Sequence, residues 1–144
     1  METGKCMACG AKFINRWQAK YCSNKCQFIF QREKYIKEWK SGNKSGNIGI
    51  TARNISTKLR KYLFEKYSSK CSVCGWNKKH PQSGNIPLEV DHIDGNSENN
   101  LENNLRLLCP NCHALTPNFK NLNHGNGRQW RNKKYIKNSD SPKP

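Results

Sequence analysis

The sequence predicts a small α+β fold that is stabilised by bound metal rather than by one large apolar core. Three observations favour this class. The chain has 144 residues, of which 34% are hydrophobic, and a mean hydropathy of −0.99, which is low for a protein that relies on core burial alone. All eight cysteines occur in close pairs. Patterns typical of helices and short strands alternate with polar loops between the cysteine pairs.

The cysteine spacing predicts two structural zinc sites. Three of the pairs are C-x2-C and one is C-x3-C. Two thiolates at this spacing on a tight turn can reach one Zn²⁺ at about 2.3 Å, and two such pairs complete a tetrahedral site. Sequence order assigns the ligands to two quartets: Cys6, Cys9, Cys22 and Cys26, then Cys71, Cys74, Cys109 and Cys112. Disulfides or redox chemistry are the alternative, which a reducing compartment disfavours.

Two glycines support this interpretation. Gly10 and Gly75 each follow a C-x2-C pair directly. A zinc knuckle often needs a positive φ at this position, which glycine adopts without steric cost.

The composition divides the chain into four segments. Residues 1–40 are expected to form an N-terminal four-cysteine zinc finger with a following helix, and residues 41–52 a flexible linker rich in Gly, Ser and Asn. Residues 53–124 hold the second quartet and form the second domain. Residues 125–144 are a basic tail with interleaved aromatic residues, a composition that suits nucleic-acid backbones and bases.

Periodicity predicts the helix of the first domain over residues 27–39. Phe28, Arg32, Tyr35 and Trp39 fall at helical spacing. We expect this stripe to be mainly a packing face, with a DNA-facing helix as the alternative.

The second domain is expected to begin with a helix over residues 56–67, for which Ser56 is a suitable N-cap. A strand over residues 86–93 follows, and Asp94-Gly95-Asn96 gives a strong turn signal. A second strand covers residues 105–108, and Pro110 can open a further helix. The order is therefore helix, strand, polar loop, strand, helix.

The charge predicts a polyanionic partner. Lys and Arg number 26 against 10 Asp and Glu, which gives a net charge of +16. A basic tail that only aids solubility is the alternative. No apolar run approaches the roughly 20 residues of a membrane span, and the N-terminus lacks the apolar core of a signal peptide. We therefore expect a soluble, cytoplasmic protein that binds DNA and no membrane.

Two histidines remain after the zinc sites are filled. His92 follows Asp91 directly, and His113 follows the last cysteine of the second quartet. Since four thiolates saturate a structural zinc, both imidazoles are free for other chemistry. A histidine beside an aspartate is a candidate general base and a candidate metal ligand.

These residues lie in two segments that resemble the HNH endonuclease family, in particular small HNH proteins of bacteriophages. The segments read LEVDHIDGN over residues 88–96 and NLRLLCPNCH over residues 104–113. The resemblance extends over roughly residues 56–128, about half of the chain. It implies a treble-clef-like ββα-metal nuclease domain.

The resemblance also implies a role for each residue. His92 would be the general base that activates water, and Asn104 would hold the loop that orients it. Asp91 and His113 would bind one divalent cation, for which Mg²⁺ or Mn²⁺ suits this ligand pair and other transition metals are alternatives. Strict strand alternation would place Asp91 and His92 on opposite faces, so a shared site requires the strand to end or twist there.

The resulting hypothesis is a metal-dependent endonuclease that hydrolyses DNA phosphodiester bonds, with two structural Zn²⁺ and one catalytic cation. It would nick as a monomer, or cut both strands as a weak homodimer or by successive nicks. A non-catalytic zinc-finger nucleic-acid-binding protein is the alternative. Another is an accessory factor of phage DNA packaging or intron mobility. If the chain is phage-encoded, it would act in the host cytoplasm. The basic residues expected to contact DNA are Arg106, Lys120, Arg128, Arg131, Lys133 and Lys134.

Overall fold

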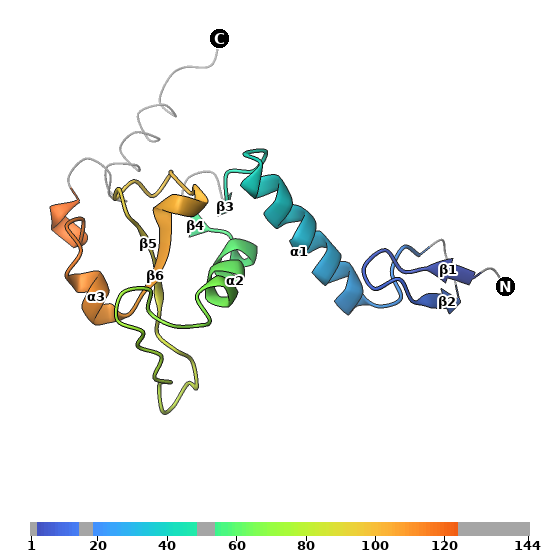
Figure 1. The fold of residues 1–144 in the computed structure, drawn as a ribbon, viewed down its shortest axis with the longest axis horizontal. Helices are drawn as coiled ribbons and strands as arrows, with labels where there is room; N and C mark the ends of the chain where they lie inside the picture. The colour runs from blue at the N-terminus through green and yellow to red at the C-terminus, as the bar shows by residue number, and fades with distance from the viewer. Residues whose placement is uncertain (1–2, 15–18, 49–53, 124–144) are drawn as a thin grey trace, which may run out of the picture. The chain divides into compact units, whose positions relative to one another are not determined.

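The computed structural model describes residues 3–14, 19–48 and 54–123. The chain forms two compact units, residues 1–44 and residues 45–144 (Figure 1). The division falls inside the segment expected to be a linker, and residues 47–48 of that segment form a strand of the second unit. The finer division into residues 1–40, 41–52, 53–124 and 125–144 stays a prediction.

The first unit is a hairpin followed by a long helix. Strands β1 (Thr3–Lys5) and β2 (Lys12–Ile14) pair antiparallel. The turn between them carries the first cysteine pair, and Gly10 there has the expected positive φ, +73°. Helix α1 (Asn24–Lys40) begins three residues earlier than the periodicity indicates, because the side chain of Ser23 caps it by accepting a hydrogen bond from the Cys26 amide.

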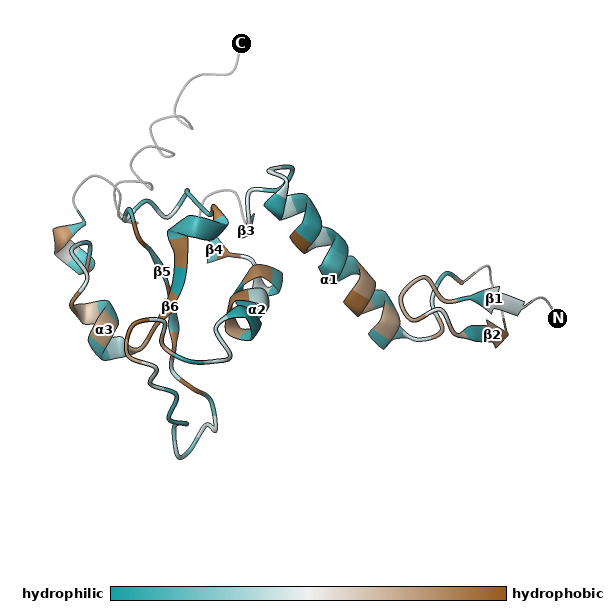
Figure 2. Ribbon diagram, viewed as in Figure 1, coloured by the Kyte–Doolittle hydropathy of each residue, from teal (hydrophilic) through white to brown (hydrophobic). Residues whose placement is uncertain are grey.

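Helix α1 buries only its C-terminal half. Ile36 and Trp39 are buried, whereas Phe28 is 71% exposed. The expected packing face is therefore wrong at Phe28 and confirmed at Trp39. Figure 2 shows the hydrophobic patches of α1 lying among hydrophilic residues. No helix in the described part of the chain is long and apolar enough to cross a membrane.

The second unit opens with two very short strands and a helix. Strands β3 (Asn47–Ile48) and β4 (Asn54–Ile55) pair antiparallel. Helix α2 (Thr57–Lys66) follows, and the side chain of its N-cap, Ser56, accepts from the Leu59 amide at 3.1 Å. The predicted cap is thus confirmed. Leu59 and Leu63, one turn apart on the predicted stripe, are fully buried.

A two-stranded sheet holds the centre of this unit. Strands β5 (Glu89–His92) and β6 (Leu105–Leu108) pair antiparallel, with His92 opposite Leu105. The short helices η1 (Glu102–Asn104), α3 (Pro110–Ala114) and η2 (Lys120–Leu122) complete the unit. Helix α2 contacts β6, and α3 contacts both strands, so the two helices flank the hairpin (Figure 1).

Leucines fill the space between the hairpin and its helices. Leu88, Leu105, Leu107 and Leu108 are each at most 1% exposed. Burial of one leucine side chain contributes about 2 kcal/mol. Because few leucines are buried, the apolar core of this unit is small. β5 is shorter than the predicted strand over residues 86–93. Before it, the Leu88 amide donates to the Ile86 carbonyl in a tight turn, and after it the His92 carbonyl accepts from the Gly95 amide.

Candidate functional site

The eight cysteine thiols gather into the two predicted quartets. Within each quartet, all four sulfur atoms lie within 4.8 Å of one another. The Sγ atoms of Cys9 and Cys22 are 3.7 Å apart, as are those of Cys74 and Cys109. Four sulfurs bound tetrahedrally at about 2.3 Å lie about 3.8 Å apart, whereas a disulfide needs about 2.05 Å. Each quartet could therefore hold one metal ion, and all eight cysteines are free.

The ionisation of the thiols fits cation binding. A backbone hydrogen bond from Cys22 lowers the pKa of Cys6 to about 6. Burial raises the pKa of Cys71, but backbone N–H groups of the knuckle outweigh it and lower that pKa to about 6. Hydrogen bonds with thiols of their own quartets raise the pKa of Cys22 and of Cys112 to about 12. Each quartet thus forms its first thiolate readily and requires a cation to form all four.

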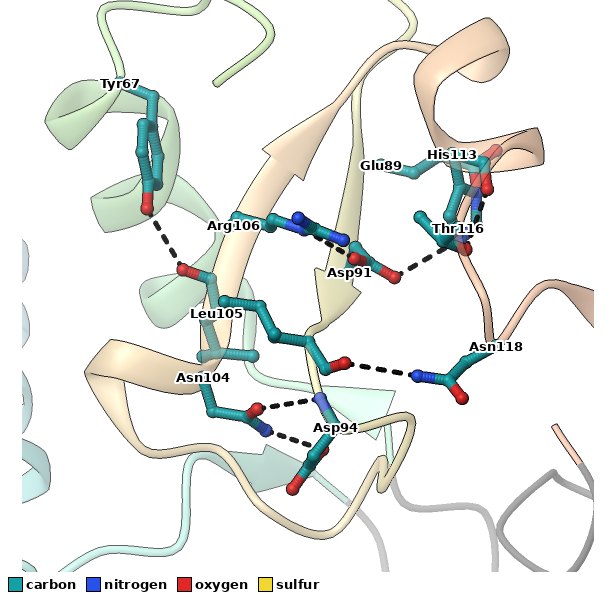
Figure 3. A network of polar contacts seen from close by, with 11 residues as sticks. Tyr67, Glu89, Asp91, Asp94, Asn104, Leu105, Arg106, His113, Thr116 and Asn118 are labelled. Carbon is teal, nitrogen blue, oxygen red and sulfur yellow. Dashed lines mark hydrogen bonds and ion pairs between the residues drawn. The ribbon is translucent and has the colours of Figure 1, made fainter. Parts of the chain in front are cut away.

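Neither His92 nor His113 belongs to a thiol quartet. His113 lies on α3 and faces β5, where its Nε2 is 3.7 Å from Oδ1 of Asp91 (Figure 3). The predicted pair of cation ligands therefore converges. The Asp91 side chain is 7% exposed and that of His113 is 25% exposed, so the carboxylate is buried and the imidazole is partly open to solvent.

Glu89 completes this face of β5, and the sequence reasoning gave it no role. Its Oε2 is 2.7 Å from Nδ1 of His113 (Figure 3). Glu89 and Asp91 are two residues apart in one strand, so their side chains leave the same face. The alternation of side chains along the strand could therefore have indicated that Glu89 lies beside Asp91. A histidine that donates Nδ1–H to a carboxylate presents a lone pair at Nε2, the nitrogen that faces Asp91.

Arg106 lies opposite Asp91 in the sheet. Its Nε donates to Oδ2 of Asp91 at 2.7 Å, so the carboxylate offers one oxygen to the guanidinium and the other to His113. The sequence reasoning placed Arg106 among the DNA contacts and did not anticipate this ion pair. Its side chain is 26% exposed, and contact with DNA stays a prediction for it.

Asn104 fastens the loop that follows β5. Its Oδ1 accepts from the Asp94 amide at 3.0 Å. Its Nδ2 donates to Oδ1 of Asp94 and to the Asn99 carbonyl, both at 2.8 Å. Burial acts to raise the pKa of Asp94, but side-chain hydrogen bonds from Asn99 and Asn104 outweigh it and hold that pKa below its usual value. The loop is thus pinned two residues beyond His92 (Figure 3).

His92 is the last residue of β5 and does not share the face of Asp91. Glu89 and Asp91 contact His113 on α3, whereas the His92 ring contacts Asn100, with Nε2 2.8 Å from Oδ1. Within the described part of the chain, no hydrogen bond or ion pair joins His92 to Asp91 or His113. Side chains of adjacent strand residues leave opposite faces, but His92 is the last residue of the strand. A site that His92 shares with Asp91 therefore depends on the turn that begins at His92.

Of the remaining residues expected to contact DNA, only Lys120 lies in the described part of the chain. Lys120 is exposed, and its Nζ lies 4.9 Å from the centre of the Phe119 ring. That ring packs edge-on against His113 at 5.4 Å. Through Phe119, Lys120 therefore lies beside the face that carries His113. Arg128, Arg131, Lys133 and Lys134 lie outside the described residues.

These features define a small α+β domain in which four cysteine thiols that could hold a metal ion lie beside a hairpin. The hairpin and a short helix present Asp91 and His113 as an acid–imidazole pair. Residues 71–117 match the family model described as HNH endonuclease. A stretch of 59 residues, 39% of the chain, is 52% identical to the H-N-H endonuclease F-TflIV of Escherichia phage T5. The chain spans about a quarter of that relative, 24% of its length. No solved structure matches. The match at residues 71–117 confirms the resemblance of this segment to the HNH endonuclease family.

Proposed function

We propose that this chain is a metal-dependent endonuclease that hydrolyses phosphodiester bonds in DNA. The convergence of Asp91 and His113 at 3.7 Å, inside the segment that matches the HNH endonuclease family, carries this proposal. In this interpretation β5, β6 and α3 form the ββα-metal arrangement of the family. The net charge of +16 would raise the local concentration of DNA.

The ligand pair fits a divalent cation such as Mg²⁺ or Mn²⁺. A carboxylate oxygen and an imidazole nitrogen suit both ions. The separation of 3.7 Å between Oδ1 and Nε2 is less than the sum of two ligand distances of about 2.1 Å, so one ion can reach both atoms. Such an ion, when bound, supplies charge neutralisation at the scissile phosphate. Asp91 and His113 would be its protein ligands, and water and phosphate would supply the others.

Side chains of the chain itself would then accept the proton and position the reacting groups. His92 accepts the proton of a water molecule as its oxygen attacks phosphorus, which contributes typically 10²–10⁴-fold to such a reaction. The bond between phosphorus and the 3′-oxygen breaks, and that oxygen takes a proton from solvent. The products carry 5′-phosphate and 3′-hydroxyl ends, as the family resemblance implies. Asn104 keeps the loop after His92 in place through its hydrogen bonds to Asp94.

The two thiol quartets would hold structural Zn²⁺. Each ion would contribute folding free energy on the order of 10 kcal/mol, which compensates for a core of few leucines. We infer a monomer or weak homodimer that nicks one strand, or cuts both by dimerising or by successive nicks.

Plasmid nicking tests this proposal. Zinc-loaded protein should convert supercoiled plasmid to open circles when Mg²⁺ or Mn²⁺ is added and should be inactive without addition, with zinc content measured in both conditions. His92→Ala should lose at least about 100-fold in rate and keep its zinc. His80→Ala is the matched control, because His80 is an exposed histidine on a loop.

A His92→Ala variant as active as the wild type would remove His92 from the mechanism. Tight DNA binding without nicking in the presence of any divalent metal would overturn the proposed nuclease activity. It would favour a non-catalytic binding module or an accessory factor.

A further inference from the structure

Asn100 is a buried polar side chain beside His92 that the proposed mechanism does not use. It lies in the loop between β5 and η1 and is 4% exposed. Its Oδ1 is 2.8 Å from Nε2 of His92. Its Nδ2 donates to the main-chain carbonyl of Ser45 at 2.9 Å and to Oδ1 of Asn47 at 2.7 Å. All of these groups belong to the second unit.

The partners of Asn100 fix the orientation of its amide. A main-chain carbonyl can only accept a hydrogen bond, so the NH₂ group of Asn100 must face Ser45. The amide oxygen must then face His92. Since this oxygen can only accept, Nε2 of His92 must carry the hydrogen of their 2.8 Å contact.

The same bond decides which nitrogen of His92 is basic. A neutral imidazole carries one hydrogen, so a hydrogen on Nε2 leaves the lone pair on Nδ1. Among the described residues, no hydrogen-bond partner is found for Nδ1. The only nitrogen left to accept a proton from water is thus Nδ1.

We propose that Asn100 is a positioning residue for His92, which holds the ring and its Nε2–H tautomer so that Nδ1 is the proton acceptor. This inference rests on the proposed nuclease function. It also gives a role to the segment before α2, because Ser45 and Asn47 accept the hydrogen bonds that orient Asn100. Both residues lie outside the stretch that matches the family.

The tautomer of His92 can be observed directly. Zinc-loaded full-length protein with ¹⁵N-labelled histidine would be compared at one fixed pH near 8 by long-range ¹H–¹⁵N correlation spectra, with His92→Ala identifying the signal. The wild type should show a protonated Nε2 and an unprotonated Nδ1. Asn100→Ala should show a mixture of the two tautomers. Asn100→Asp loses the donor bonds to Ser45 and Asn47 but keeps an acceptor for Nε2–H, so Nε2 should stay protonated.

Cleavage provides the second measurement. Asn100→Ala should lose roughly 10- to 100-fold in single-turnover nicking with DNA affinity and zinc content unchanged, and Asn100→Asp should recover part of that loss. Asn77→Ala, at an exposed asparagine, is the matched control and should behave as the wild type.

A wild-type His92 protonated on Nδ1, or an Asn100→Ala variant with unchanged tautomer and rate, would overturn the role of Asn100. If the wild type fails to nick DNA, the nuclease proposal fails, whereas the tautomer spectra still decide whether Asn100 sets the state of His92. Should Asn100→Ala fail to fold, the wild-type and Asn100→Asp spectra decide it.

Discussion

Glu89 shows how one exposed carboxylate can set the chemistry of a histidine. Its side chain is 57% exposed, yet its Oε2 lies 2.7 Å from Nδ1 of His113. The imidazole that donates to it must keep its lone pair on Nε2, the atom that faces Asp91. Carboxylate partners of this kind orient metal-binding histidines and raise their basicity. In the proposed nuclease, Glu89 would therefore act through His113 rather than on the substrate.

Replacement of Glu89 by alanine should weaken the cation site without removing it. We expect Glu89→Ala to raise the Mg²⁺ or Mn²⁺ concentration for half-maximal nicking by roughly 10- to 100-fold, with a nearly normal rate at saturating metal. Glu89→Gln should be milder, because its amide oxygen still accepts from Nδ1. A metal titration of the nicking rate checks this. Glu33→Ala on α1 is an exposed control, and identical metal curves for it and Glu89→Ala would refute the role.

At the scale of elements, the turn after β5 joins the hairpin to the C-terminal part of the unit. Gly95 there has φ +72°. A Cβ at this position would lie 2.7 Å from Cγ of Asn118 and 2.8 Å from Oδ1 of Asn123. The same two asparagines donate to the carbonyls of Ile93 and Gly95. The turn thus requires glycine for its backbone and for the close approach of its neighbours.

A comparison with Gly84 distinguishes the cost of the positive φ from the cost of close neighbours at Cβ. Gly84 has φ +68° but has open space where a Cβ would lie. Gly84→Ala should therefore cost only the backbone strain, about 1 kcal/mol in the free energy of unfolding. Gly95→Ala should cost that strain plus about 1–3 kcal/mol for overpacking, and should slow nicking because His92 lies three residues away. Denaturant unfolding of both variants measures the difference. Equal costs would contradict the crowding at Gly95.

The three α-helices and the two strands of the central hairpin were predictable because their signals are local, whereas the short strands β1 to β4 were not predicted. Ser56 as a cap and the leucines of α2 follow from residue type and period. Cysteine spacing indicated both quartets for the same reason. Contacts between distant residues were not predictable: Asn100 reaches Ser45 across 55 residues, and the Arg106–Asp91 pair depends on a strand register that the periodicity does not specify. The sequence therefore did not predict the hydrogen bonds and ion pair that hold the residues of the candidate site in place.

At the scale of the whole molecule, each of the two units has its own thiol quartet, and we expect the units to have different roles. The second unit carries the acid–imidazole pair, His92 and the family match. The first unit has a thiol quartet of its own, and its residues 1–44 include ten Lys and Arg against three Glu. No sequence-predicted catalytic residue lies in it. We therefore expect its contribution to the proposed function to be electrostatic attraction to DNA.

Removal of the first metal ion in the full chain tests this division. Cys9 and Cys22 are both exposed, so the double substitution Cys9→Ser with Cys22→Ser removes ligands without opening a cavity. The zinc content should fall from two ions per chain to one, as the thiol quartets imply. Nicking should persist at saturating DNA, but binding should weaken and the slope of log affinity against log salt should become shallower, because fewer phosphates are neutralised.

The same change in the other quartet is the matched control. Cys74→Ser with Cys112→Ser should also leave one zinc ion, yet it should abolish nicking, because that quartet holds β6 and α3 beside the acid–imidazole pair. The two variants thus have equal metal content and opposite activity. An unchanged salt slope after loss of the first ion would mean that the N-terminal unit contacts a protein rather than DNA. Loss of nicking at saturating DNA would mean that the first unit also shapes the catalytic one.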